Sequence, residues 1–158
     1  MQLLWMSLFA LGIVAADQIT KFLVVTYIPL HTDCVVIPGI VNLTYVQNTG
    51  AAFSMFAGMQ WLFALVFAAM TVTVLWFYWK KRSFFTTPEW WCIASIYGGA
   101  LGNMIDRIRL GYVVDMVKPT FVNFAVFNLA DCFIVCGCIL LIIHLWFLNQ
   151  AFWKDDKK

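Results

Sequence analysis

The stretch FNLADCFIVCGCILLIIHLWF, residues 127–147, decides the class of fold. From Cys132 onward it is almost wholly apolar, which predicts a membrane helix. Asp131 directly precedes that run. An ionised carboxylate beside hydrocarbon is costly in free energy unless it is paired, hydrated or protonated. A second carboxylate, Asp115, stands among apolar neighbours in VVDM, residues 113–116. Because carboxylates in such apolar surroundings usually have a function, we predict that Asp115 and Asp131 form a catalytic pair.

The composition is that of an integral membrane protein. Apolar residues make up 63% of the 158 residues, charged residues only 11%, and the mean hydropathy is +0.86. These values are too apolar for a soluble domain of this length. The net charge of +2 comes without a basic stripe, so we expect no nucleic-acid partner. The five cysteines lack paired spacing and indicate no disulfide framework.

Three cysteines cluster in the last apolar run, at Cys132, Cys136 and Cys138. Cys132 adjoins Asp131, which raises the alternative of a metal site or a functional thiol. A zinc site needs several convergent Cys or His ligands, and a helix spreads these three around its circumference. We therefore expect small apolar packing residues here, and we predict neither a metal nor a cofactor.

Four apolar runs can span a bilayer core, which takes about 20 helical residues. For the first run, the alternative of a cleaved signal peptide is disfavoured because no basic residue precedes its apolar part. We predict an all-α membrane protein that forms one domain over residues 1–158. The predicted spans are 3–25, 61–79, 90–107 and 130–148, and the predicted outer connections are 26–60 and 108–129.

Basic residues set the predicted orientation. They gather in the link between the second and third spans and in the C-terminal tail, at Lys80, Lys81, Arg82, Lys154, Lys157 and Lys158. Residues 27–60 contain no Lys or Arg. By the positive-inside rule, both termini are cytoplasmic and the first and third connections face outward. Arg107, Arg109 and Lys118 weaken this contrast without reversing it.

This orientation brings the unusual polar residues into one layer at the outer membrane surface. Asp17 and Lys21 fall in the outer half of the first span, spaced i,i+4 with the acid first, which favours a helical ion pair. The pair is either purely structural or a support for a nearby site. Asn103 and Asp106, spaced i,i+3, share one face at the outer end of the third span.

Two stretches of the outer connections are predicted to form strands. Residues 40–46 alternate apolar and polar side chains, and residues 121–127 are rich in β-prone types. Together they predict a small sheet lying on the membrane. Gly98 and Gly102 in the third span form a small-xxx-small pattern, which predicts close approach of a neighbouring helix backbone.

Five motifs along the chain resemble those of bacterial lipoprotein signal peptidase, also called signal peptidase II. They are DQITK (17–21), NTGAAF (48–53), GGALGNMIDR (98–107), VVD (113–115) and FNLAD (127–131). The resemblance covers nearly the entire chain, with minor departures at Gln47 and Met116. It implies an intramembrane aspartic endopeptidase of the bacterial inner membrane, with four transmembrane helices and a small β-cradle on the outer, periplasmic face. Its substrate would be a diacylglyceryl-modified prolipoprotein, cut just before the lipidated cysteine.

The resemblance also implies roles for single residues. The dyad would be Asp115 and Asp131. Residues that position substrate and stabilise the dyad would be Asn48, Asn103, Arg107 and Asn128, and residues that support the local structure would be Asp17, Lys21, Gly50 and Asp106. The expected partners are the lipidated precursor and membrane lipid, and the expected state is a monomer.

The predicted chemistry is peptide hydrolysis by two close carboxylates that share one proton, one acting on a water and the other on the scissile carbonyl. Intramembrane carboxylates also suit a small proton-coupled transporter or channel. Against this alternative, the predicted polar residues gather at one surface and form no path across the bilayer. A scaffold without chemistry would not need Asp115 and Asp131.

Overall fold

The computed structural model describes residues 1–51, 55–80 and 82–149. Part of one quoted motif, Ala52 and Phe53, lies outside the described residues. So do four of the basic residues used for the orientation, Lys81, Lys154, Lys157 and Lys158.

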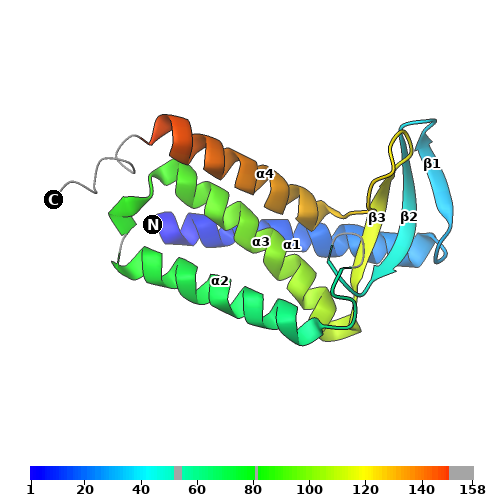
Figure 1. Ribbon diagram of the computed structural model, residues 1–158, viewed down its shortest axis with the longest axis horizontal. Helices are drawn as coiled ribbons and strands as arrows, with labels where there is room; N and C mark the ends of the chain where they lie inside the picture. Colours follow the sequence, from blue (N-terminus) through cyan, green and yellow to red (C-terminus); the bar gives the residue numbers. More distant parts are fainter. Residues whose placement is uncertain (52–54, 81, 150–158) are drawn as a thin grey trace.

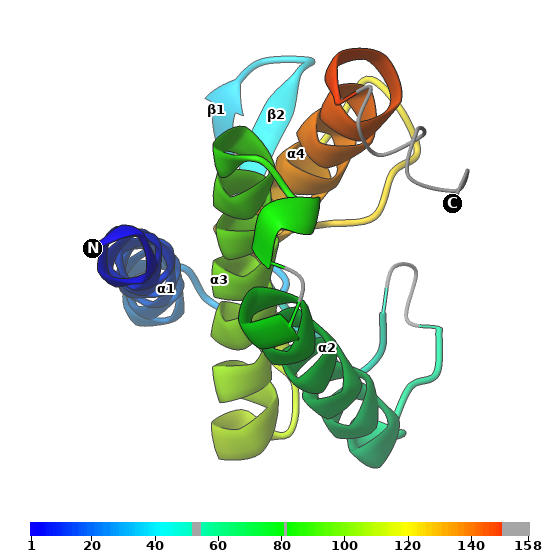
Figure 2. The ribbon, with the colours of Figure 1, turned by 90° about the vertical axis from the view of Figure 1, so that its left-hand side faces the viewer.

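Helix α3 (Thr87–Leu110) is the central element of the structure, and the other long helices pack around it (Figure 2). These are α1 (Gln2–Tyr27), α2 (Gln60–Lys80) and α4 (Leu129–Ile143). A short π-helix, η3 (His144–Leu148), continues α4, and a 3-10 turn, η2 (Arg82–Phe84), lies between α2 and α3. Each predicted span therefore forms a helix.

Glycines let α1 and α4 approach α3 closely, as the small-xxx-small pattern predicts. A Cβ atom on Gly98 would lie 2.9 Å from the carbonyl oxygen of Ala10 in α1. A Cβ atom on Gly99 would lie 2.5 Å from the carbonyl oxygen of Ala130 in α4. No side chain fits at these distances, so the backbones of three helices meet at this point.

Among the described helices, three are long and apolar enough to cross a membrane: α1, α2 and the continuous helix Leu129–Leu148. Helix α2 has no buried residue, and large apolar side chains such as Trp61, Leu65 and Trp79 are more than half exposed along it. Apolar exposure on this scale requires a partner other than water, and hydrocarbon satisfies it. The chain is therefore membrane-embedded.

A three-stranded antiparallel sheet closes one end of the bundle, opposite the end where α1 begins and α4 finishes (Figure 1). Its order is β1 (Asp33–Ile37), β2 (Val41–Asn48), β3 (Val113–Pro119). The register places Val46 of β2 opposite Asp115 of β3, after an irregularity that begins at Leu43. The sheet thus holds Asp115 at the end of the helix bundle.

The strand predictions were right in one place and wrong in another. Residues 40–46 correspond to β2, but residues 121–127 form no strand; Phe127 makes only an isolated bridge with Val117. The second neighbour of β2 is β3 instead, which ends at Pro119. The first four residues of β3 are all buried and every residue of β1 is exposed, so neither strand shows the alternation that reveals a half-buried strand.

Candidate active site

Asp131 is placed by the first turn of α4. Asn128 is the N-cap residue, and its Oδ1 atom accepts a hydrogen bond from the backbone N–H of Asp131 at 3.0 Å. In return, the Oδ2 atom of Asp131 accepts from the backbone N–H of Asn128 at 3.1 Å. This reciprocal capping box is a local consequence of Asn-x-x-Asp at a helix start. It leaves the second carboxylate oxygen of Asp131 available for another donor.

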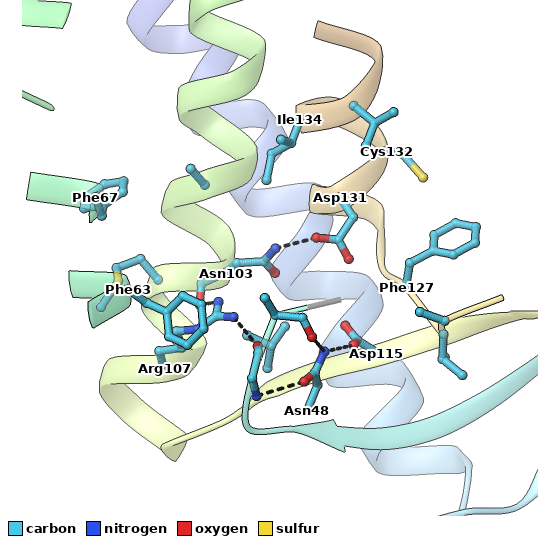
Figure 3. A pocket seen from close by; sticks show the side chains of 18 of the residues that line it. Asn48, Phe63, Phe67, Asn103, Arg107, Asp115, Phe127, Asp131, Cys132 and Ile134 are labelled. Atoms are coloured by element: carbon cyan, nitrogen blue, oxygen red, sulfur yellow. Dashed lines mark hydrogen bonds between the residues drawn. The ribbon is translucent and has the colours of Figure 1, made fainter. Parts of the chain in front are cut away.

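Asp115 of β3 and Asp131 of α4 line the same pocket (Figure 3), and Asn128 contacts both carboxylates. The Nδ2 atom of Asn128 donates to Oδ1 of Asp115 at 2.7 Å. Asn128 is fully buried and Asp115 is 2% exposed. One residue therefore contacts both acids, with its side chain on Asp115 and its backbone on Asp131.

Two further amides complete the contacts of the pair. Asn48, the last residue of β2, donates from Nδ2 to Oδ2 of Asp115 at 2.8 Å, and Asn103 of α3 donates from Nδ2 to Oδ1 of Asp131 at 2.8 Å. Each carboxylate thus accepts two hydrogen bonds from neutral N–H groups. Within the described part of the chain, neither acid forms an ion pair.

The electrostatic surroundings favour proton retention by Asp115. Burial raises the pKa of the Asp115 carboxyl from its ordinary value of 3.8 to about 6. The hydrogen bond from Asn48 opposes this rise, and the nearby charge of Asp131 adds to it. A carboxyl of this kind can hold a proton near neutral pH, which an exposed aspartate does not.

A buried ion cluster lies beside the pair, and it contains the predicted supporting residues. The Nζ atom of Lys21 lies 2.8 Å from Oδ2 of Asp17 and 2.9 Å from Oδ2 of Asp106. All three side chains are 3% exposed or less. Gln18, which the sequence reasoning did not assign to the site, donates from Nε2 to Oδ1 of Asp106 at 2.9 Å. The sequence signals for Gln18 were its polarity within an apolar span and its place in the DQITK motif.

Arg107 and Gly50 meet in the pocket that the pair lines. The Nη2 atom of Arg107 donates to the carbonyl oxygen of Gly50 at 2.8 Å, and the guanidinium lies 4.2 Å above the centre of the Phe63 ring. The backbone N–H of Gly50 donates to Oδ1 of Asn48 at 2.9 Å. That bond turns the Nδ2 atom of Asn48 toward Asp115.

A pocket of about 590 Å³ lies between α2 and α4. The carboxylate pair and Arg107 line it. Its charged and amide side chains are Asp115, Asp131, Asn48, Asn103 and Arg107. Most of the remaining wall is apolar and includes Phe63, Phe67, Phe127 and Ile134 (Figure 3). An apolar pocket with a few convergent polar groups suits a ligand that is itself largely apolar.

The cysteines take different positions around this pocket. Cys132 and Cys136 line it, and all five cysteines are free. Across residues 1–51, 55–80 and 82–149, no group of three or more His, Cys, Asp or Glu side chains is arranged to hold a metal ion.

The prediction of a single polar layer was wrong in part. A second buried polar cluster lies at the opposite end of the bundle, where Glu89 is fully buried. Its Oε1 atom lies 2.9 Å from Nδ1 of His144 and accepts from Nδ2 of Asn149 at 2.9 Å. Glu89 also closes a capping box with Thr86 at the start of α3. The cluster ties the beginning of α3 to both ends of η3, a pairing that has no signal in the local sequence.

An apolar helix bundle with a largely apolar pocket that holds two carboxylates places the chain among integral membrane enzymes. It superposes on a solved chain described as a bacterial membrane enzyme at 2.3 Å resolution, with a TM-score of 0.82, 31% identity, and coverage of 96% of this chain and 92% of that one. A second solved bacterial membrane enzyme, at 1.9 Å, gives a TM-score of 0.77 at 31% identity and covers 90% and 92% of the two chains.

Sequence comparison identifies the family. The family model for signal peptidase (SPase) II matches residues 9–147, and the chain belongs to this family. It is 44% identical to a lipoprotein signal peptidase of Lactococcus lactis over 146 residues, which are 91% of this chain and 94% of the relative. It is 45% identical to a lipoprotein signal peptidase of Streptococcus agalactiae over 137 residues, 85% and 86% of the two chains. The protein is therefore a hydrolytic membrane enzyme, as its motifs predict.

Proposed function

We propose that this enzyme cleaves the signal peptide from diacylglyceryl-modified prolipoproteins, N-terminal to the lipidated cysteine, with Asp115 and Asp131 as its catalytic dyad. One observation carries the proposal. Two carboxylates, Asp115 buried and Asp131 half-buried, both contact Asn128, accept hydrogen bonds from neutral amides, and line one largely apolar pocket. Buried carboxylates that serve structure alone are usually paired with cations, as Asp17 and Asp106 are here.

The chemistry follows from the sharing of one proton. The charge of Asp131 adds to the rise in the pKa of Asp115, so the two carboxylates do not ionise independently, and the active form of the pair holds one proton. The ionised member takes a proton from water as the water oxygen attacks the scissile carbonyl carbon, and the protonated member gives its proton to the carbonyl oxygen. When the tetrahedral intermediate collapses, the C–N bond breaks, the carboxyl that took the proton from water gives it to the leaving amine, and the other carboxylate takes a proton from a hydroxyl of the intermediate as the carbonyl re-forms.

The remaining site residues act on the dyad and on the substrate. Asn48, Asn103 and Asn128 hold the two carboxylates and, with Arg107, position the substrate backbone. Arg107 faces the pocket with its guanidinium contacts directed to carbonyl oxygens and to an aromatic ring, so its charge is available to an incoming carbonyl group. The apolar walls suit the signal peptide and the acyl chains of the substrate. No metal or cofactor enters this mechanism.

The orientation belongs to the same proposal. We place four spans in the bacterial inner membrane, with both termini cytoplasmic and the dyad at the periplasmic side, and we propose that the enzyme works as a monomer in contact with lipid. Helix α3 is the span that we add to the three long apolar helices described above. Its residues 90–105 contain no charged side chain, which supports this assignment. Its charged residues lie at its ends, at Glu89 and at Asp106, Arg107 and Arg109.

Substitution of the dyad tests the proposal. In purified enzyme, Asp115→Asn and Asp131→Asn should each lower the rate of cleavage of a diacylglyceryl-modified precursor by roughly a thousandfold or more, because neither amide can act as an acid or base. Asp33→Asn is the matched control, since Asp33 lies on β1 and pairs with Lys118. Retained cleavage in both dyad variants would contradict the proposal. A proton flux lost in the same variants would favour the transporter or channel alternative.

A further inference from the structure

Lys21 occupies a position that the reaction itself does not require. Its ammonium group is 3% exposed and has three N–H donors, all of which are used. Two go to Asp17 and Asp106, and the third goes to Oδ1 of Asn103 at 2.9 Å. The two carboxylates already neutralise the charge of Lys21. Its contact with the neutral amide of Asn103 therefore has a role other than charge pairing.

The two carboxylate partners of Lys21 hold the backbone next to the dyad. Oδ1 of Asp17 accepts from the N–H of Ala130, the residue before Asp131, at 3.1 Å. Oδ2 of Asp106 accepts from the N–H of Val114, the residue before Asp115, also at 3.1 Å. One ammonium group therefore connects both chain segments that carry the dyad, although neither segment adjoins it in the sequence.

The third contact reaches the dyad through a side chain. An ammonium cannot accept a hydrogen bond, so the atom of Asn103 that faces Lys21 must be the oxygen. The Nδ2 atom of Asn103 then faces Asp131, to which it donates at 2.8 Å. A cation on the oxygen of an amide also polarises its N–H groups and strengthens the bond that they donate.

The charge balance around the dyad gives Lys21 a second influence. The other charged side chains that face this region are Asp17 from α1 and Asp106 and Arg107 from α3. The described residues of β2 include no charged side chain, and the only one in α2 is Lys80, at its far end. Two cations thus balance two anions beside Asp115 and Asp131, and loss of Lys21 would leave an excess of negative charge.

We propose that Lys21 is a positioning residue for the dyad, which acts on Asp131 through Asn103 and sets the pH range over which the dyad holds one proton. The inference rests on the proposed function. Without Lys21, the ionised form of the dyad is less stabilised, so a proton is held to higher pH. A plot of kcat against pH rises on its acid side as the first of the two carboxyls loses its proton, and we call this rise the acid limb. Without Lys21 the acid limb then moves to higher pH.

The test measures kcat and KM against pH with a diacylglyceryl-modified precursor and enzyme in lipid. Lys21→Met should lower kcat by about tenfold or more, leave KM within about twofold, and move the acid limb upward by about one pH unit. The double variant Asp17→Asn/Lys21→Met removes the buried charges as a pair and keeps an oxygen at position 17 for the N–H of Ala130. It should fold and still show a lowered kcat, with the acid limb displaced upward by less than in Lys21→Met, because the charge balance is kept and only the contact with Asn103 is lost.

Gln18→Leu is the matched control. Gln18 bonds to Asp17, Asp106 and the carbonyl oxygen of Gly102 but not to Asn103. Its loss should lower the melting temperature and leave the acid limb in place. A wild-type limb in the double variant, or failure of both Lys21 variants to fold, would reduce Lys21 to a structural ion and overturn the inference. Asp115→Asn separates the two claims: if it is inactive while the Lys21 variants keep the wild-type limb, only the role of Lys21 fails.

Discussion

The Nδ2 atom of Asn128 lies 2.7 Å from Oδ1 of Asp115, and this contact joins a helix cap to a strand. The same residue caps α4 with its Oδ1 atom, which faces the backbone N–H of Asp131. Because a backbone N–H can only donate, the cap fixes the direction of the Asn128 amide, whose Nδ2 atom donates to Asp115 and to Oδ1 of Asn103. A requirement of local helix structure thereby orients a residue of the site.

Asn128→Asp should separate capping from catalysis. Aspartate caps helices as well as asparagine does, whereas Asn128→Ala loses about 1 kcal/mol of capping free energy. The new carboxylate oxygen would face Asp115 in place of a donor, so the rate of cleavage should fall by roughly a hundredfold or more. Thermal unfolding and precursor cleavage measured on both variants check this. Near-wild-type cleavage by Asn128→Asp at neutral pH would show that Asp115 does not need the amide donor.

The raised pKa of Asp115 predicts that the free energy of unfolding decreases as the pH rises. Since the folded pKa of about 6 exceeds the ordinary value of 3.8, the folded state binds the proton more tightly than the unfolded state does. Folding is therefore favoured as pH falls from 6 toward 4, and the free energy of unfolding decreases as pH rises through that window, by on the order of 3 kcal/mol.

Asp115→Asn should remove this pH dependence. The variant should melt at a higher temperature than the wild type at pH 8, and the gap should close near pH 4. Unfolding curves of the two proteins at matched pH values measure it. A gap that stays constant from pH 4 to pH 8 would rule out a raised pKa for Asp115.

Close packing between α3 and α4 makes Gly99 sensitive to substitution. In Gly99→Ala the added methyl group would meet the carbonyl oxygen of Ala130, so we expect a loss of about 1–3 kcal/mol in the free energy of unfolding. Cleavage should also fall, because Ala130 adjoins Asp131. Gly12→Ala in α1 is the control: no atom lies within 4 Å of its Cβ position, and the change should be neutral or stabilising by up to about 1 kcal/mol.

Arg107→Lys should reduce activity although the positive charge is kept. A lysine cannot make both the contact with the carbonyl oxygen of Gly50 and the stacking contact with Phe63. Loss of one charge-assisted hydrogen bond corresponds to a decrease in kcat/KM of roughly tenfold to a hundredfold. Arg109→Lys is the matched control, because Arg109 is exposed, lies two residues from Arg107 on α3 and does not line the pocket. Equal activity of the two variants would argue against a substrate-binding role for Arg107.

Cys34 tests the proposed orientation. It is exposed on β1, and the other cysteines lie within helices. In intact protoplasts, a membrane-impermeant maleimide should label the wild-type protein and fail to label Cys34→Ser. Labelling that appears only after the cells are opened would place the sheet, and the pocket beside it, on the cytoplasmic side.

The helices were predictable because membrane spans follow from local composition. Runs such as residues 61–79 need only be apolar and long, and α2 (Gln60–Lys80) reproduces that run to within one residue at each end. The carboxylates were predictable as candidates because charge in an apolar context is rare. The strand at residues 113–119 was not, since burial on both faces removes alternation, and Glu89 was not, since its partners His144 and Asn149 are more than fifty residues away.

The sequence by itself determined which segments are helical, which polar residues are out of place in hydrocarbon, and the family to which they point. Composition and short spacings are local properties, so a single chain displays them. Only the tertiary structure decided that Asn128 contacts both acids, that Lys21 joins their two backbone segments, and which atom of Asn103 faces Asp131. These relationships depend on the packing of α1, α3, β3 and α4 against one another. A hydrogen bond between distant segments forms only when folding brings its donor and acceptor to within about 3 Å, so its partners and direction cannot be read from the sequence.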